Sequence, residues 1–181
     1  KAIEHLEKFS PSWPIPKIFR LTKSNKVIEG VFKGETLNTP SMLCVEDYLD
    51  ALNWVGEIGG LKACIKRAND SFDFINAWVS DSSSIDFLCQ ETINRSNTSV
   101  CLKFKDNRVI NLDEDAQRNL AKEIGILLER EGVALDIVNH RSAPPGLRIW
   151  TGATVEPTDV RALLPWIDWA YNHAFNEIIG K

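Results

Sequence analysis

Apolar residues recur at steps of four and three along residues 61–79, and this pattern constrains the fold more than any other feature of the chain. Residues at that spacing share one face of an α-helix, because a helix turns once in about 3.6 residues. A helix with one apolar stripe buries that stripe against another layer of structure. The stripe consists of Leu61, Ile65, Ala68, Phe72, Ile75 and Val79.

Further helical and strand patterns follow this helix. Helices are expected over 48–55, ended by Gly59 and Gly60, over 116–127, and over 160–178 with Thr158 as N-cap. Strands are expected over 85–88, 98–104, 133–137 and around Arg148, and the first two are expected to pair. Helices grouped with a small sheet in this order predict an α+β fold.

The first part of the chain has a different character. Pro11, Pro14 and Pro16 interrupt it, and residues 17–37 alternate loosely around a turn-like segment at 23–26. This pattern predicts an extended arm with a hairpin.

Composition limits the classes of function. The 181 residues are 44% hydrophobic and 25% charged, with a formal net charge of -4, which is typical of a soluble chain with one domain, or a small domain with an arm. The charge argues against a general nucleic-acid or membrane surface. Cys44, Cys64, Cys89 and Cys101 show no paired spacing and are expected to be reduced, buried thiols of a cytoplasmic protein without a metal site.

Two arginines and a histidine flank a Pro-Pro-Gly turn in residues 140–150. The guanidinium groups of Arg141 and Arg148 match carboxylate or phosphate oxygens, so an acidic small molecule is one expected ligand. Salt bridges from these arginines to neighbours such as Asp136 or Glu156 are an equally good interpretation of the spacing. The residues alone leave both interpretations open.

A second candidate site precedes the helix expected at 48–55. In Asn38-Thr39-Pro40-Ser41, Thr39 is expected as N-cap and Pro40 at the first helical position. A helix N-terminus with a hydroxyl and an amide nearby suits a phosphate group. An ordinary helix cap is the simpler interpretation.

Other polar and aromatic residues have structural interpretations. We expect His5 and His173 at exposed helix positions and Arg95 in a structural role. Trp150, Trp166 and Trp169 are expected to pack in the core.

Two segments resemble bacterial phosphoserine aminotransferases: residues 143–156 (APPGLRIWTGATVE) and 32–48 (FKGETLNTPSMLCVEDY). The resemblance implies the small C-terminal domain of a fold-type I pyridoxal-phosphate enzyme over 43–181, preceded by an arm or linker over 1–42. The chain opens with Lys1 inside a helix-like segment, so we expect it to be part of a longer protein.

The resemblance also implies roles for individual residues. Asn38 and Thr39 would reach the cofactor phosphate held by the other subunit of a homodimer. Arg148 would bind the α-carboxylate of the amino-acid substrate. His140 and Arg141 would hold the distal anion, although the Pro-Pro-Gly turn departs from the glycine-rich turn of other branches.

The enzyme of this family transfers an amino group between glutamate and 3-phosphohydroxypyruvate in serine biosynthesis, with pyridoxal phosphate as cofactor. The resemblance places the Schiff-base lysine and the aspartate of the pyridine nitrogen outside this chain, which is therefore expected to hold no catalytic residue and to be inactive alone. A related aminotransferase of the serine-glyoxylate type and a stand-alone module that binds acidic metabolites are alternatives. The His140-Arg141 pair favours the first assignment over the serine-glyoxylate type.

Overall fold

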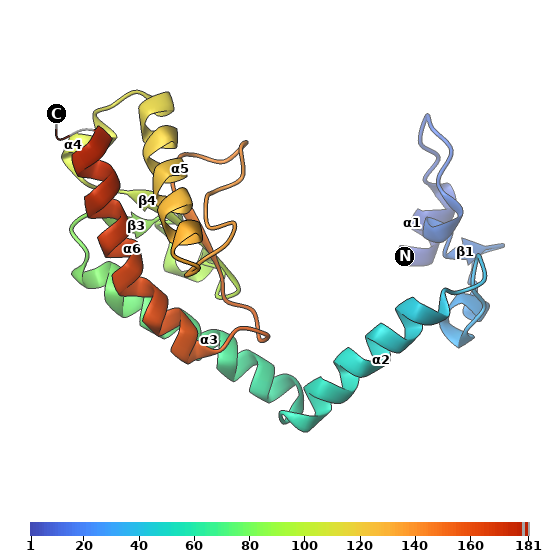
Figure 1. Cartoon of the computed structure of the whole chain (residues 1–181). Coiled ribbons are helices and arrows are strands. Elements are labelled where there is room, and N and C mark those ends of the chain that lie inside the picture. The colour runs from blue at the N-terminus through green and yellow to red at the C-terminus, as the bar shows by residue number, and fades with distance from the viewer. Residues whose placement is uncertain (179, 181) are drawn as a thin grey trace. The chain divides into compact units, whose positions relative to one another are not determined.

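The computed structural model describes residues 1–178 and residue 180. The chain divides into two compact units, Lys1–Trp54 and Val55–Lys181, termed unit 1 and unit 2 (Figure 1). Helix α2 (Met42–Glu57) runs across the boundary in sequence. The expected division into an arm over 1–42 and a domain over 43–181, whose last residue lies outside the described residues, stays a prediction.

Unit 2 has the expected α+β fold, with a three-stranded antiparallel sheet in the order β3-β4-β5. Its helices α3 (Gly60–Asp81) and α5 (Glu114–Arg130) both pack against α6 (Pro157–Ile178). The strands are β3 (Ile85–Phe87), β4 (Ser99–Phe104) and β5 (Leu147–Trp150). The short helix η3 (Thr92–Asn94) lies between β3 and β4, and the short helix α4 (Asn107–Ile110) lies with α5 between β4 and β5. The predicted pairing of the first two strands is confirmed, with Ile85 opposite Phe104.

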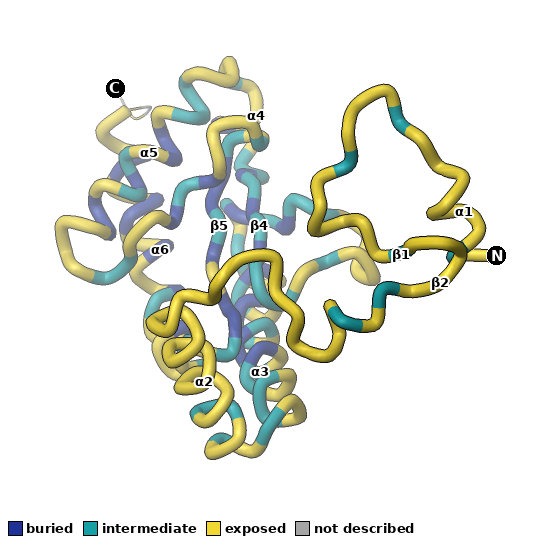
Figure 2. The backbone as a smooth tube through the Cα atoms, turned by 90° about the vertical axis from the view of Figure 1, so that its right-hand side faces the viewer, coloured by how far each residue is buried: buried dark blue, intermediate teal, exposed yellow. Residues whose placement is uncertain are grey.

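The core lies between one face of the sheet and the helices, as the buried stretches of tube in Figure 2 show. Val100, Leu102 and Phe104 alternate along β4 and are all buried, because successive side chains of a strand point to opposite faces. The apolar stripe of α3 is buried at Ala68, Ile75 and Val79. Its first members, Leu61 and Ile65, are exposed, so the stripe is covered over only part of its length.

The strand expected over 133–137 is absent. Gly132 and Asp136 have positive φ angles of 69° and 51°, which interrupt an extended backbone. Val138, directly after this segment, makes an isolated bridge with Leu147. The three alternating apolar residues therefore did not predict the structure, because Gly132 before the segment and Asp136 within it set the backbone conformation.

Two expected helix starts are also wrong. Helix α2 begins at Met42, and the carbonyl of Ser41 accepts a hydrogen bond from the Val45 amide, so Thr39 is not the N-cap. Helix α6 begins with Pro157, a residue suited to the first turn because it lacks an N–H, and Thr158 lies inside the helix. Asp113, by contrast, caps α5 by accepting a hydrogen bond from the Ala116 amide.

Unit 1 contains the expected hairpin, and its interpretation as an arm stays a prediction. It contains α1 (Ala2–Lys8), η1 (Lys17–Phe19), β1 (Thr22–Lys23), β2 (Lys26–Val27) and η2 (Glu29–Lys33). Strands β1 and β2 pair across Ser24 and Asn25, whose φ angles of 53° and 60° are those of a tight hairpin turn. No residue of Lys1–Trp54, all of which are described, is buried.

Several single-residue expectations differ from the structure. Trp150, Trp166 and Trp169 lie at the surface, with exposed fractions of 58%, 41% and 38%. The four cysteines are free thiols, but Cys44 is exposed and the others are only partly buried. His5 and His173 occupy exposed helix positions as expected. Among the described residues, no helix is long and apolar enough to cross a membrane.

Candidate functional site

The three expected substrate residues of unit 2 lie on one hairpin-like segment. Residues 137–139 and 146–148 run antiparallel, because the Asn139 amide donates to the Gly146 carbonyl at 3.1 Å and the Arg148 amide donates to the Ile137 carbonyl at 2.7 Å. Residues 140–145 close this stem and are termed the arginine loop. The loop carries His140 and Arg141, and Arg148 lies at the stem.

The stem and the loop are tied to the sheet by a buried amide. The side chain of Asn139, 8% exposed, donates to the carbonyl of Leu102 at 3.3 Å and to that of Pro144 at 3.1 Å. Gly146 has a φ of 152°, and a Cβ there would lie 2.0 Å from the Leu102 carbonyl oxygen. Only glycine lets the backbone approach β4 this closely. The backbone is therefore held against β4 both before the loop, at Asn139, and after it, at Gly146.

An arginine that the sequence did not single out also holds the loop. Nη2 of Arg118, on α5, donates to the carbonyl of Ala143 at 2.9 Å. The same nitrogen lies 2.5 Å from Oε1 of Glu114, one helical turn earlier. The spacing from Glu114 indicates a helix-surface pair, and no local pattern could show the contact with a loop 25 residues away.

Arg118 and Arg141 line the same cavity. Its volume is about 270 Å³, and its walls come from α5 and the two ends of the arginine loop. No acidic residue in the described parts of the chain lies within ion-pair distance of Arg141, so its charge is not neutralised by a neighbour. The lining residues are Arg118, Ala121, Val138, Asn139, Arg141, Pro145 and Gly146.

Arg148 is engaged differently. Its Nη2 donates to Oδ2 of Asp136 at 3.0 Å, so the salt-bridge interpretation holds in this structure. The two side chains are 39% and 86% exposed, and a pair so open to water contributes at most about 1 kcal/mol. The other neighbour considered, Glu156, pairs instead with Arg67 at 2.5 Å.

His140 is exposed at the start of the loop. Its Nδ1 accepts a hydrogen bond from the Ser142 amide at 3.2 Å, and its carbonyl accepts one from the Ala143 amide at 2.7 Å. As an acceptor, Nδ1 carries no proton, which leaves Nε2 as the donor of the neutral ring. The imidazole can therefore donate to an anion without being charged.

Asn38 and Thr39 belong to unit 1 and form a second candidate site. They lie between η2 and α2 and are exposed. Neither side chain makes a hydrogen bond to any residue that the structure describes. An amide and a hydroxyl without partners are donors of the kind that phosphate oxygens accept, so both residues fit a cofactor phosphate chemically.

The pKa values that depart most from ordinary values lie in a different cluster. The Arg108 guanidinium donates to Asp106 and holds the pKa of that carboxyl down at about 2. Burial, with the neighbouring Asp106 carboxylate, raises the pKa of Tyr171 to about 12. Because Tyr171 donates to Asp106 at 2.9 Å, this cluster ties the start of α4 to α6 and is structural.

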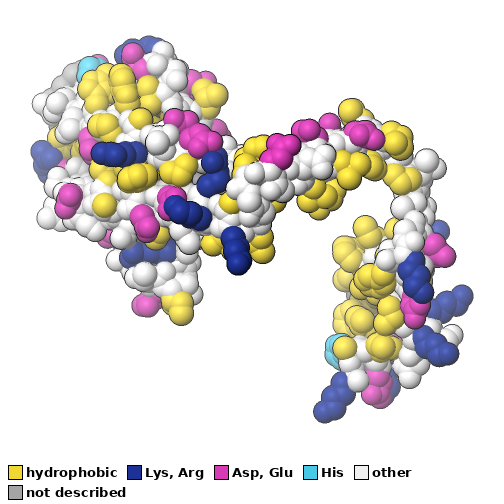
Figure 3. Space-filling view, turned by 90° about the horizontal axis from the view of Figure 1, so that it is seen from below, with side chains coloured by type: hydrophobic (Ala, Val, Ile, Leu, Met, Phe, Trp, Pro, Cys, Tyr) yellow, Lys and Arg dark blue, Asp and Glu magenta, His cyan; other side chains and the backbone are white. Residues whose placement is uncertain are grey.

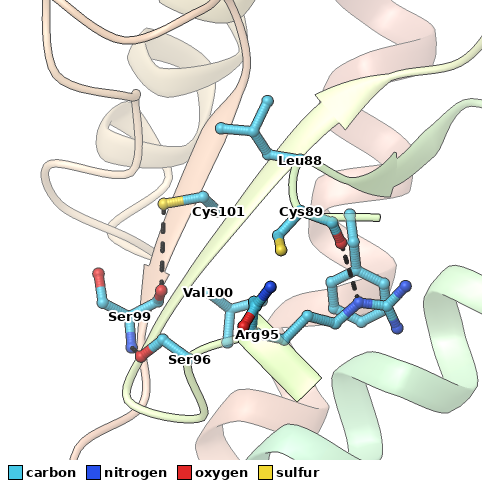
Figure 4. A pocket seen from close by; sticks show the side chains of 9 residues that line it. Leu88, Cys89, Arg95, Ser96, Ser99, Val100 and Cys101 are labelled. Atoms are coloured by element: carbon cyan, nitrogen blue, oxygen red, sulfur yellow. Dashed lines mark hydrogen bonds between the residues drawn. The ribbon is translucent and has the colours of Figure 1, made fainter. Parts of the chain in front are cut away.

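Another cavity, of about 290 Å³, lies beside the connection between β3 and η3 (Figure 4). Cys89 and Cys101 line it with Arg95. The Arg95 guanidinium donates to the carbonyls of Cys89 and Gln90 and lies 4.1 Å from the centre of the Phe87 ring. Arg95 is thus held by its own neighbours, which agrees with its expected structural role.

No family model matches the chain. Curated relatives do match, and the chain spans less than half of their length. It is 46% identical over 172 residues to the phosphoserine aminotransferase of Methanosarcina barkeri, covering 95% of this chain and 44% of the relative. The phosphoserine aminotransferase of a Nocardioides species is 27% identical over 159 residues, which cover 88% of this chain and 39% of that relative.

Solved structures show the same fold. The phosphoserine aminotransferase from Bacillus circulans subsp. alkalophilus matches with a TM-score of 0.64 and 22% identity over 79% of this chain and 36% of that one. A second structure, from a study of radiation damage of the Schiff base in phosphoserine aminotransferase, matches with a TM-score of 0.65 and 19% identity. This match covers 81% of this chain and 38% of the other chain. Over nearly its whole length, the chain is therefore homologous to part of phosphoserine aminotransferase.

Proposed function

We propose that this chain is the C-terminal portion of a phosphoserine aminotransferase and supplies substrate and cofactor contacts to that enzyme. The reaction would transfer an amino group between glutamate and 3-phosphohydroxypyruvate in serine biosynthesis, in a cytoplasmic homodimer. The observation that carries the proposal is the single hairpin bearing Arg141, which has no acidic partner within the described residues, and Arg148, whose only such partner is a surface carboxylate.

Arg148 binds the α-carboxylate of the substrate in this proposal. In this structure the Arg148 guanidinium already binds a carboxylate, because its Nη2 donates to Oδ2 of Asp136 at 3.0 Å. Because that pair is exposed and weak, an incoming α-carboxylate can replace Asp136 with little loss of stability. The planar fork then fixes the orientation of the amino acid.

His140 and Arg141 hold the distal anion, which is the phosphate of phosphoserine or the side-chain carboxylate of glutamate. Arg141 brings an unneutralised charge, and the His140 ring brings a donor at Nε2. A pocket that serves both substrates needs a positively charged side chain that can move to meet either a phosphate or a carboxylate. An exposed arginine on a loop, such as Arg141, meets that need.

Asn38 and Thr39 would donate to the phosphate of the cofactor held by the partner subunit. Pyridoxal phosphate supplies the electron sink for the chemistry when it is bound. The resemblance places the Schiff-base lysine outside this chain, so we expect the 181-residue chain alone, mixed with pyridoxal phosphate, to show no active-site Schiff-base absorbance and no transamination.

The test is a chimera in which this chain replaces the matching 172 residues of the Methanosarcina barkeri protein. We expect transamination between phosphoserine and 2-oxoglutarate, lost when Arg148 becomes Ala. Arg130→Ala is the matched control, since Arg130 is an exposed arginine of α5 whose one ion pair within residues 1–178 is with its neighbour Glu131. A folded chimera that binds the cofactor but acts equally with and without Arg148 would contradict the proposal.

Substrate choice separates the alternatives. An enzyme of the serine-glyoxylate type would use serine and glyoxylate in preference to phosphoserine and would not depend on Arg141. A stand-alone module would bind phosphoserine to the isolated chain and give no activity in the chimera. Loss of phosphoserine turnover in Arg141→Ala, with slow alanine turnover kept, would support the proposed enzyme.

A further inference from the structure

We propose that Arg118 of α5 is a second arginine of the distal-anion site, beside Arg141, and that the cavity these two residues share takes the distal phosphate of the substrate. This rests on the proposed function, which places the distal anion at the arginine loop. It adds a residue from another element of the fold and makes the site a pocket instead of a loop surface.

The geometry supports a shared site. Arg118 and Arg141 both line the cavity of about 270 Å³, one from the helix and the other from the loop. The contact from Nη2 of Arg118 to the Ala143 carbonyl, 2.9 Å long, holds the loop against the helix. Nη1 of Arg118 donates to no residue in the described part of the chain, so it keeps two N–H groups for a ligand.

The charges around the cavity favour a divalent anion. Two guanidinium groups face one carboxylate, that of Glu114, which lies on Arg118 at 2.5 Å. The Glu114 side chain is 66% exposed, so this pair is a weak one that a phosphate can displace. A phosphate monoester, with close to two negative charges and three terminal oxygens, can accept from both arginines at once.

The lining of the cavity also includes apolar side chains. Ala121 and Val138 line it together with the two arginines, and an anion there depends on the arginines to offset its loss of hydration. Charge-assisted hydrogen bonds are stronger where water is excluded. The cavity thus combines apolar lining with two guanidinium groups.

The experiment measures binding of inorganic phosphate and of phosphoserine to the 181-residue chain. Titration calorimetry gives affinities, and the guanidinium N–H signals in nitrogen-15 NMR spectra show which arginines respond. We expect phosphate to shift the signals of Arg118 and Arg141 and leave that of Arg130 unchanged. Arg118→Ala should weaken phosphate binding about tenfold, and Arg130→Ala should not change it.

Two further variants distinguish an anion-binding role of Arg118 from a purely structural role in supporting the arginine loop. Glu114→Gln removes the competing carboxylate and should tighten phosphate binding by about twofold to fivefold, whereas a loss of loop support would weaken it or leave it unchanged. Arg118→Lys keeps the charge and should restore part of the affinity lost in Arg118→Ala.

The outcomes distinguish this inference from the proposed function. Phosphoserine binding that depends on Arg141 and Arg148 but not on Arg118 would overturn the inference and leave the function standing. Phosphate that shifts neither guanidinium signal would also overturn it. If phosphoserine does not bind to the chain and the chimera is inactive, the proposed function fails as well.

Discussion

Unit 1 and unit 2 use apolar residues in opposite ways. In unit 2, apolar side chains from the four helices α3, α4, α5 and α6 and from one face of the sheet form a closed core. In unit 1, Trp13, Phe19 and Phe32 are 59%, 66% and 69% exposed, and none of its residues is buried. Figure 3 shows apolar side chains gathered on the surface of unit 1 and along α2.

The comparison teaches that apolar content alone does not predict burial. A side chain is buried when another element of the chain supplies the opposite wall, as α6 does for α3 and α5. Apart from α2, the elements of unit 1 are short and lack such a wall, since its two strands are two residues each. Its exposed apolar surface is of the kind that other protein surfaces cover.

The largest expected effect comes from removing one core side chain. Leu120 is fully buried on α5, so Leu120→Ala should lower the free energy of unfolding by about 2–5 kcal/mol. The matched change in unit 1, Phe32→Ala, should alter it by less than about 0.5 kcal/mol. Urea denaturation followed by circular dichroism measures both. Equal losses would show that unit 1 has a core of its own.

The second effect concerns the backbone of the arginine loop. Gly146→Ala places a Cβ 2.0 Å from the Leu102 carbonyl oxygen and should cost about 3 kcal/mol. Gly56→Ala is the control, because nothing lies within 4 Å of its added Cβ and alanine suits its helical position near the end of α2. A small cost at Gly146 would mean that the loop can move away from β4.

Much of unit 2 was predictable because its helices and two of its strands have regular periods. Ile75 and Leu102 are buried where the periodicity places them. The failures have two physical causes, which are local backbone conformation and tertiary packing. Residues 133–137 alternate like a strand, yet Asp136 takes a positive φ, and Trp166 lies on the outer side of a helix whose other face is buried.

The candidate site was predictable only where its residues are close in sequence. His140, Arg141 and Arg148 lie on one hairpin, and their spacing together with the resemblance identified them. Arg118 was missed because its link to Ala143 spans 25 residues and depends on how α5 packs. The roles of all these residues stay predictions.

The third effect is a pH dependence confined to unit 2. Asp106 has a pKa of about 2 in the folded chain, below its ordinary value of 3.8, so it stabilises the fold above about pH 4. That contribution is lost as the pH falls from about 4 to 2, and it should amount to something on the order of 1 kcal/mol. Asp106→Asn should flatten this part of the stability curve. Midpoints of urea denaturation at pH 7 and pH 3, measured for the unmodified chain and for Asp106→Asn, give the change in stability with pH for each protein.

The smallest expected effect on stability is at Asp136, and it separates a structural arginine from one available to a ligand. Asp136→Asn removes the only carboxylate that the described structure places on Arg148, and because the pair is exposed, unfolding should change by less than about 0.5 kcal/mol. If Arg148 serves the α-carboxylate of a substrate, the same change should lower the KM for phosphoserine in the chimera, since the substrate no longer competes with Asp136. If Arg148 only stabilises the stem, Asp136→Asn should reduce stability and leave KM unaltered. A fall in stability without a change in KM would therefore return Arg148 to the salt-bridge interpretation that its sequence neighbours also allowed.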